Sequence, residues 1–124
     1  MVFEEGFEGY TLKCAVIRMG NDYTLAVYGG EKPHVGSVAM AIARPSLTGE
    51  GVGVTSSVVN AMGHKDEAVG RLFAEEVARS RRCTAVCSCG IHIDHIRPEQ
   101  IEHIREASRR LLRRVLEELK KDQT

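Results

Sequence analysis

The chain has 124 residues, which is the size of one domain built around a single hydrophobic core. Its 17 basic and 17 acidic side chains cancel to a formal net charge of zero, so it lacks the basic surplus that binding to a nucleic-acid backbone requires. No apolar run approaches the roughly 20 residues that a membrane span needs, and the first residues lack the order of a signal peptide. We therefore expect a cytoplasmic protein with neither nucleic-acid nor membrane partners.

The first half of the chain is predicted to form strands. Residues 10–19 and 23–28 are rich in β-branched and aromatic side chains, and Gly20-Asn21-Asp22 between them favours a tight hairpin turn. Further strands are expected from about 35 to 43 and from 52 to 59. This succession of strands favours antiparallel pairing.

Two helices are predicted in the second half. Apolar residues at helical spacing indicate a helix over 66–81, and Pro98 begins a long final helix over 98–121. A short apolar strand over 83–89 lies between them. The predicted order ββββαβα describes a single two-layer α+β domain over 1–124, with a mostly antiparallel sheet, both helices on one face and a loose N-terminal segment over 1–9.

The sheet face that no helix covers is expected either to meet water or to pair with a second copy, which makes a homo-oligomer the expected state. In the third predicted strand Ala39, Ala41 and Ala43 alternate with larger apolar residues. Their side chains form a face small enough for another group to approach closely.

Histidines gather in glycine-punctuated segments at the predicted ends of elements. These histidines are His34, His64, His92 and His95. Because rigid scaffolds present binding groups at the ends of their elements, we expect the imidazoles to meet in one concavity.

Two of these segments suit an anionic ligand. Gly63-His64-Lys65-Asp66 leads into a helix, whose first backbone N–H groups lack intrahelical partners, and Lys65 adds a positive charge. Many helices begin in this way without binding anything. Gly29 and Gly30 allow close approach of the backbone to a ligand, although the same segment also suits an ordinary loop.

His92 and Asp94 should point the same way if their strand continues. An Asp beside a His fixes the tautomer of the ring and raises its pKa, which suits proton handling or hydrogen bonding to a ligand. A hydrogen-bonded pair with only a structural role is an equal alternative. His103, on the final helix among charged neighbours, is expected to be solvated.

The cysteines of the last strand raise the question of a zinc site. Cys87 and Cys89 precede His92 and His95, but a Cys-x-Cys pair on a straight strand does not wrap both sulfurs around one tetrahedral ion. Buried small apolar side chains are the favoured interpretation. No catalytic residue is assigned, because no nucleophile-and-base arrangement is evident.

Three segments together resemble a known family. Gly29-Gly30-x-x-Pro33-His34-x-Gly36, Gly63-His64-Lys65-Asp66 and Gly90-Ile91-His92-Ile93-Asp94 look like the LpdD-like proteins, small partners of UbiD-type decarboxylases regarded as prenylated-flavin chaperones. The resemblance covers most of the chain, from the first hairpin to the start of the last helix.

The resemblance implies a non-catalytic carrier that binds reduced prenylated flavin mononucleotide and delivers it to a UbiD-type decarboxylase. The residues implied to bind this cofactor are Gly29, Gly30, His34, His64, Lys65, His92 and Asp94. The flavin ring would lie against the small alanine side chains of the third strand.

Two alternatives remain open from the residues alone. One is a metal-dependent enzyme that uses His64, His92 and His95, with Asp94 orienting a ligand. The other is a protein assembly chaperone without a small ligand. Bound metal that survives dialysis would favour the first alternative, and a co-purifying partner without flavin would favour the second.

Overall fold

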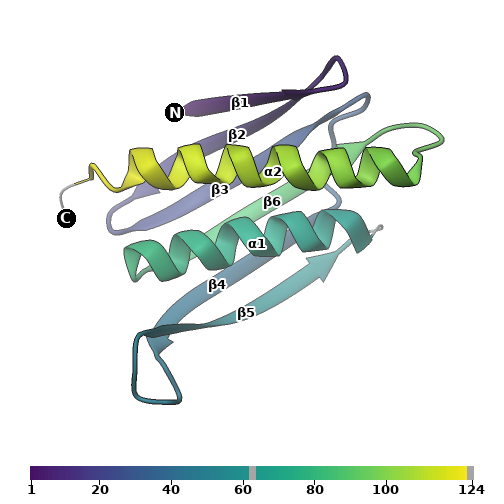
Figure 1. The fold of residues 1–124 in the computed structure, drawn as a ribbon. Coiled ribbons are helices and arrows are strands. Elements are labelled where there is room, and N and C mark those ends of the chain that lie inside the picture. Colours follow the sequence, from purple (N-terminus) through teal and green to yellow (C-terminus); the bar gives the residue numbers. More distant parts are fainter. Residues whose placement is uncertain (62–63, 123–124) are drawn as a thin grey trace.

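Six strands and two helices make up the fold (Figure 1). The computed structural model describes the backbone of residues 1–61 and 64–122, and the side chains of these residues apart from 64–66. The elements are β1 (Val2–Phe7), β2 (Tyr10–Met19), β3 (Asp22–Gly30), β4 (Ser37–Pro45), β5 (Val52–Asn60), α1 (His64–Arg81), β6 (Thr84–His92) and α2 (Pro98–Leu119).

The strands form one sheet in the order β1-β2-β3-β6-β4-β5. All neighbours pair antiparallel except β3 and β6, which run parallel, with Tyr23 opposite Ala85 and Gly30 opposite His92. β6, the last strand in the sequence, therefore lies between the β2–β3 hairpin and the β4–β5 hairpin. This insertion brings the end of β3 beside the end of β6.

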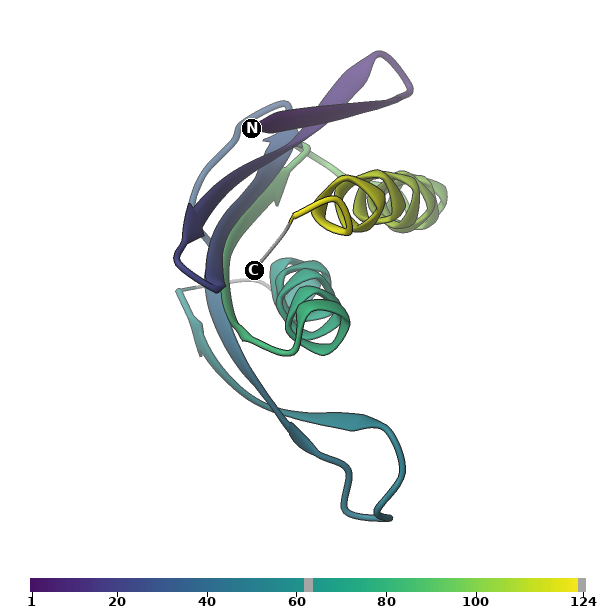
Figure 2. The ribbon, with the colours of Figure 1, turned by 90° about the vertical axis from the view of Figure 1, so that its left-hand side faces the viewer.

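Both helices lie on the same face of the sheet, and the sheet curves around them (Figure 2). Helix α1 packs on β4, β5 and β6, while α2 packs on β1 and β2. The predicted two-layer α+β architecture, with a mostly antiparallel sheet and both helices on one side, is thereby confirmed.

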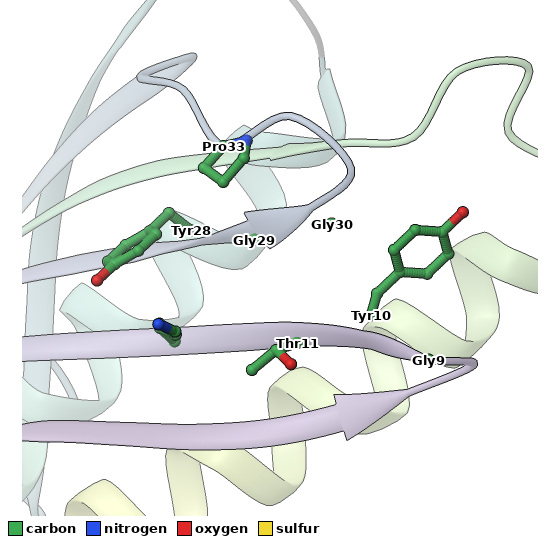
Figure 3. A pocket seen from close by; sticks show the side chains of 8 residues that line it. Gly9, Tyr10, Thr11, Tyr28, Gly29, Gly30 and Pro33 are labelled. Carbon is green, nitrogen blue, oxygen red and sulfur yellow. The ribbon is translucent and has the colours of Figure 1, made fainter.

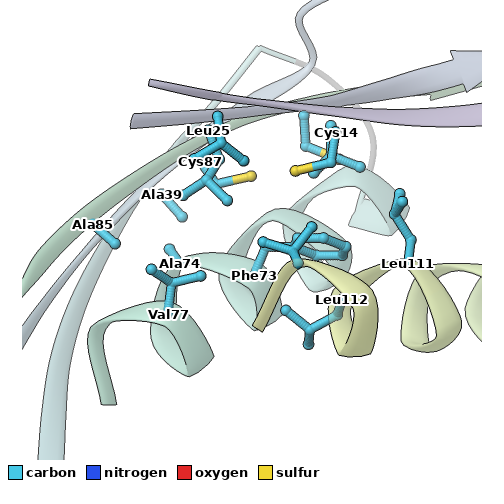
Figure 4. Close-up of a cluster of buried hydrophobic side chains, with 14 of the residues drawn as sticks. Cys14, Leu25, Ala39, Phe73, Ala74, Val77, Ala85, Cys87, Leu111 and Leu112 are labelled. Carbon is cyan, nitrogen blue, oxygen red and sulfur yellow. The ribbon is translucent and has the colours of Figure 1, made fainter. Parts of the chain in front are cut away.

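The core lies between the sheet and the helices (Figure 4). Alternation within each strand sends one set of side chains into it, as with Leu12 and Cys14 of β2. From the helices, Phe73 of α1 and Leu111 of α2 are fully buried in the same cluster. The opposite set of strand side chains forms the face that no described helix covers, which we call the open face.

The N-terminal segment differs from expectation. Instead of a loose segment over 1–9, the chain forms β1, which pairs along its whole length with β2. The element order is therefore βββββαβα. The strand-forming residues of β1, Val2, Phe3 and Phe7, are separated by Glu4, Glu5 and Gly6, which strands disfavour, and burial of Phe7 in the core supplies a tertiary contact that holds the strand in place.

The small alanine face of β4 also has a different role from the one expected. Ala39 and Ala41 are fully buried beneath α1, so a helix rather than a flavin ring lies against them. The large residues that alternate with them, Met40 and Ile42, are the exposed ones. Small side chains on this strand let α1 approach the sheet closely.

The turn between β1 and β2 is held to α2 by a cluster around Glu8. This carboxylate contacts the Nδ1 atom of His103 and accepts a hydrogen bond of 3.5 Å from Gln100, while Arg97 lies 3.7 Å away. His103 was expected to be solvated. It is half-exposed but paired, and the hydrogen bond to Glu8 raises its pKa.

This pair predicts a pH-dependent contribution to stability. The pKa of His103 is raised in the folded protein. Its contribution to the stability of the fold is therefore complete below pH 6.5, the ordinary pKa of histidine, and is lost as the pH rises through the pKa of the folded state. The pKa of Glu8 is lowered, chiefly by His103. The contribution of Glu8 to stability is therefore complete above pH 4.5, the ordinary pKa of glutamate, and is lost as the pH falls through the pKa of the folded state. The difference in melting temperature between wild type and His103→Ala should therefore be largest between about pH 4.5 and 6.5. A difference that does not change with pH would contradict the pairing, and His95→Ala serves as the control.

None of the described helices is long and apolar enough to cross a membrane.

Candidate functional site

A loop after β3 crosses the end of β6 and builds the candidate site. The backbone N–H groups of Glu31 and Lys32 both donate to the carbonyl oxygen of His92, at 2.7 and 3.1 Å. Further along, the N–H of Gly36 donates to the carbonyl oxygen of Cys89 at 2.8 Å. Residues 31–36 therefore form a strap that is anchored to β6 at both of its ends.

Gly90 is the residue that lets the strap pass. A Cβ atom at this position would lie 1.6 Å from the carbonyl oxygen of His34, far inside any contact distance. The glycine in Gly90-Ile91-His92 is therefore explained by chain packing, and it places the backbone of His34 directly on β6.

His92, Asp94 and Lys32 form a connected polar group above the strap. The Nε2 atom of His92 lies 2.8 Å from Oδ1 of Asp94, and Nζ of Lys32 lies 3.0 Å from Oδ2. All three side chains are substantially exposed. His92 and Asp94 were expected to point the same way if their strand continued. The strand ends at His92 and Asp94 lies in the turn that follows, yet the two side chains meet.

The charges of this group are fixed by its contacts. The hydrogen bond from His92, followed by that from Lys32, holds the pKa of Asp94 well below its usual range, and Asp94 in turn raises the pKa of Lys32. An ionised carboxylate only accepts hydrogen bonds, so Nε2 of His92 carries a proton. In the neutral ring Nδ1 is then the acceptor, and it is the atom suited to a ligand's donor group.

His34 joins the group from the strap. Its ring stands edge-on to that of His92, with 6.1 Å between the ring centroids. The Nδ1 atom of His34 donates to the carbonyl oxygen of Lys32 at 3.2 Å, which leaves Nε2 as the acceptor of the neutral ring. Two histidines that are 58 positions apart in the chain are therefore neighbours, as their turn positions predict.

A pocket of about 400 Å³ adjoins this group on the open face (Figure 3). It lies over the start of β2 and the end of β3, and Gly30, the register partner of His92, joins it to the polar group. The residues that line it are Gly9, Tyr10, Thr11, Lys13, Tyr28, Gly29, Gly30 and Pro33. The pocket therefore offers an ammonium group, a hydroxyl group and an aromatic ring beside two imidazoles.

Sequence reasoning missed Lys13, Tyr28 and Lys32. The alternation of β2 and β3 was visible in the sequence and places Lys13 and Tyr28 opposite each other on one face. The sequence did not reveal that β3 pairs with β6. Only this pairing places Lys13 and Tyr28 beside His92.

Gly29 and Gly30 line the pocket, but packing of the chain also requires them. A Cβ on Gly29 would lie 2.2 Å from the carbonyl oxygen of Thr11, and one on Gly30 would lie 2.7 Å from that of His92. Gly30 also has a φ of +80°, which favours glycine. The two glycines were expected to let a ligand approach the backbone closely. In the structure they let neighbouring segments of the backbone approach each other.

Some predicted site residues lie outside the described side chains. His64 and Lys65 belong to this group, and only the start of α1 at His64 is defined. Figure 1 shows that both helices begin at the end of the sheet where β3 and β6 end. His95 has a left-handed backbone, with a φ of +54°.

The cysteines take no part in the site. Cys14, Cys83, Cys87 and Cys89 are buried and form no disulfide. Burial raises the pKa of Cys14 to about 12 and that of Cys83 to about 11, which disfavours the thiolate that metal binding needs. Cys87 and Cys89 face the helices, whereas His92 lies on the other face of β6. Among the described residues no group of three metal-ligating side chains is found.

The fold and the site define a small α+β protein with a polar pocket on an otherwise uncovered sheet face, and with no nucleophile-and-base pair among the described pocket residues. The domain described as "Prenylated flavin chaperone LpdD-like" matches residues 6–120, and the chain belongs to this family. The suspected resemblance is thereby confirmed over almost the whole chain. No individual curated protein matches it.

Proposed function

We propose that this protein is a carrier of prenylated flavin mononucleotide that holds the cofactor in the pocket between β2 and β3 and delivers it to a UbiD-type decarboxylase. The observation that carries the proposal is the location of this pocket beside the His34, His92 and Asp94 group, in a chain of the prenylated flavin chaperone family. The carrier performs no chemistry of its own.

The residues fit the two ends of such a cofactor. A flavin phosphate carries negative charge near neutral pH, and Lys13 and Lys32 are the cations within the site. Lys13 lies 3.5 Å from Glu4 and Lys32 lies 3.0 Å from Asp94, so each has an exposed partner that a phosphate can replace. Both helices begin at the end of the sheet where β3 and β6 end, but on its other face.

The flavin ring needs an apolar wall and groups that match its polar edge. Tyr28 supplies the aromatic surface in the pocket, and stacking on such a ring favours a planar ligand. His92 offers a ring nitrogen that accepts a hydrogen bond, which suits an N–H group of a reduced flavin, and the ring of His34 stands edge-on beside it. This set of groups gives orientation without a nucleophile, as a carrier requires.

Retention of the cofactor tests the proposal. Reduced prenylated flavin mononucleotide, mixed with the protein under anaerobic conditions, should remain bound on a desalting column. Lys13→Ala should weaken binding roughly tenfold or more, because a hydrogen-bonded charge pair with the phosphate is lost. Lys121→Ala removes a lysine from the end of α2 and should leave binding unchanged. Equal retention by both variants would contradict the assignment of the pocket.

Delivery is tested separately. The loaded carrier should activate an apo-decarboxylase of the UbiD type more effectively than the same amount of free cofactor does. His92→Ala should lower this activation in proportion to its loss of retention. A carrier that retains the cofactor but gives no more activation than free cofactor would contradict the delivery step alone.

A further inference from the structure

The open face exposes large apolar side chains on both sides of its centre. Ile17 is 62% exposed on β2, Met40 is 44% exposed on β4, and Val59 is 73% exposed on β5. Antiparallel sheets that face water on one side normally carry polar residues there. The open face therefore has the character of a contact surface.

The middle of this face carries no charge. The strand register aligns its side chains in two adjacent rows that cross the sheet. One row contains Val2, Ala15, Ala26, Ser88, Val38 and Val59, and the other contains Ile17, Thr24, Val86, Met40 and Ser57. Charged groups, such as the pair of Glu4 and Lys13, lie outside these rows.

The lack of charge on this face favours a second copy of the chain as its binding partner. An uncharged face offers nothing to a strongly charged partner, but it is complementary to itself, and a two-fold contact uses the same patch on both subunits. The formal net charge of zero means that two copies do not repel each other. The small side chains of Ala26 and Ser88 at the centre allow the two sheets to approach closely.

The shape of the sheet connects this contact with the pocket. The sheet bends around its helices, so the open face is convex (Figure 2). Two convex faces touch along their middle strands and diverge toward their ends and edges. The pocket over Lys13, Tyr28 and Gly30 lies in such a diverging region, where the second copy would form the opposite wall.

We propose that two copies pack through their open faces and that the second copy closes the pocket over the bound cofactor. The second part rests on the proposed function. In one copy the pocket is bounded by the sheet, by the turn at Gly9 and by Pro33 of the strap, and it is open on its outer side, whereas cofactor sites usually bury most of their ligand. The dimer supplies the missing apolar wall in a chain with only three tyrosines, three phenylalanines and no tryptophan.

Sedimentation equilibrium of the complete chain tests the contact. Wild type should be dimeric, and Met40→Glu should raise the dimer dissociation constant roughly a hundredfold or more, because it brings uncompensated charges into the contact. Met40→Leu should remain dimeric. Leu47→Glu, which adds the same charge at a side chain that is 89% exposed in the β4–β5 turn, should also remain dimeric. A monomeric wild type, or a folded Met40→Glu that is as dimeric as Leu47→Glu, would overturn the proposal.

Cofactor retention by the same variants separates the two proposals. Met40→Glu should retain reduced prenylated flavin mononucleotide at least tenfold less tightly than Leu47→Glu does, with an unchanged far-ultraviolet spectrum that shows it to be folded. If monomeric Met40→Glu binds as well as wild type, the second copy does not close the pocket, although the carrier function stands. If dimeric wild type binds no cofactor, the carrier function fails while packing through the open face stands.

Discussion

Gly90→Ala should lower the free energy of unfolding by about 3 kcal/mol or more, which places it among the severe single substitutions. The added methyl group would lie 1.6 Å from the carbonyl oxygen of His34, so the strap has to leave β6. Its hydrogen bond from Gly36 to Cys89 would be lost with it. Because the strap also positions His34 and Lys32, cofactor retention should fall together with stability.

Chemical denaturation measures this effect directly. Gly6→Ala is the matched control, since a Cβ on Gly6 of β1 meets only an ordinary contact of 3.8 Å and its φ is not positive. It should change stability by less than about 0.5 kcal/mol. If Gly90→Ala unfolds at the same denaturant concentration as Gly6→Ala, the strap does not lie against β6 as described.

Phe73→Ala should cost about 3–5 kcal/mol, because it leaves a cavity at the centre of the core where α1 meets the sheet. Phe73 is fully buried and lies among Cys14, Leu25 and Leu111 (Figure 4). The site lies on the other face of the sheet. Below the lowered melting temperature, the folded variant should therefore retain cofactor as wild type does.

Phe3→Ala provides the comparison for Phe73→Ala. Phe3 of β1 is only partly buried, at the edge of the same core, so its removal should cost clearly less. Thermal melting followed by circular dichroism measures both variants. A loss of cofactor in folded Phe73→Ala would show that the core and the pocket are coupled, contrary to their placement on opposite faces.

Local patterns predicted most of the elements because each strand and helix here carries its own signal. The hairpin of β2 and β3 follows from Gly20 and Asn21, and the long helix from Pro98 and its apolar spacing. β1 was missed because Glu-Glu-Gly interrupts the apolar residues of its short sequence, Val-Phe-Glu-Glu-Gly-Phe. Its pairing with β2 depends on tertiary contacts, including that of Phe7, and on the ion pairs of Glu5 with Arg110 and Arg114.

Only the part of the site that local sequence patterns mark could be predicted. His34, His92 and Asp94 could be singled out because glycines mark their turns. The pairing of His92 with Asp94 was expected from a strand that continues through residue 94, whereas β6 ends at His92 and the contact forms with the turn that follows. Lys13 and Tyr28 could not be assigned to the same site, because their neighbour relation depends on strand order. Strand order is a property of the whole fold, and no local pattern records that β6 inserts beside β3.

The central place of β6 in the sheet leaves strand edges unpaired while the chain is being synthesised. Strands β1 to β5 leave the ribosome before β6 does, so the facing edges of β3 and β4 have no partner until residue 92 has been synthesised. Unpaired edges of this kind invite association with other chains. Binding competence also arrives late, because the imidazole of His92 and the floor beneath the strap are made in that same final step. A truncated chain that ends before β6 would have the hairpins and the residues that line the pocket, but neither the imidazole of His92 nor the strand on which the strap rests.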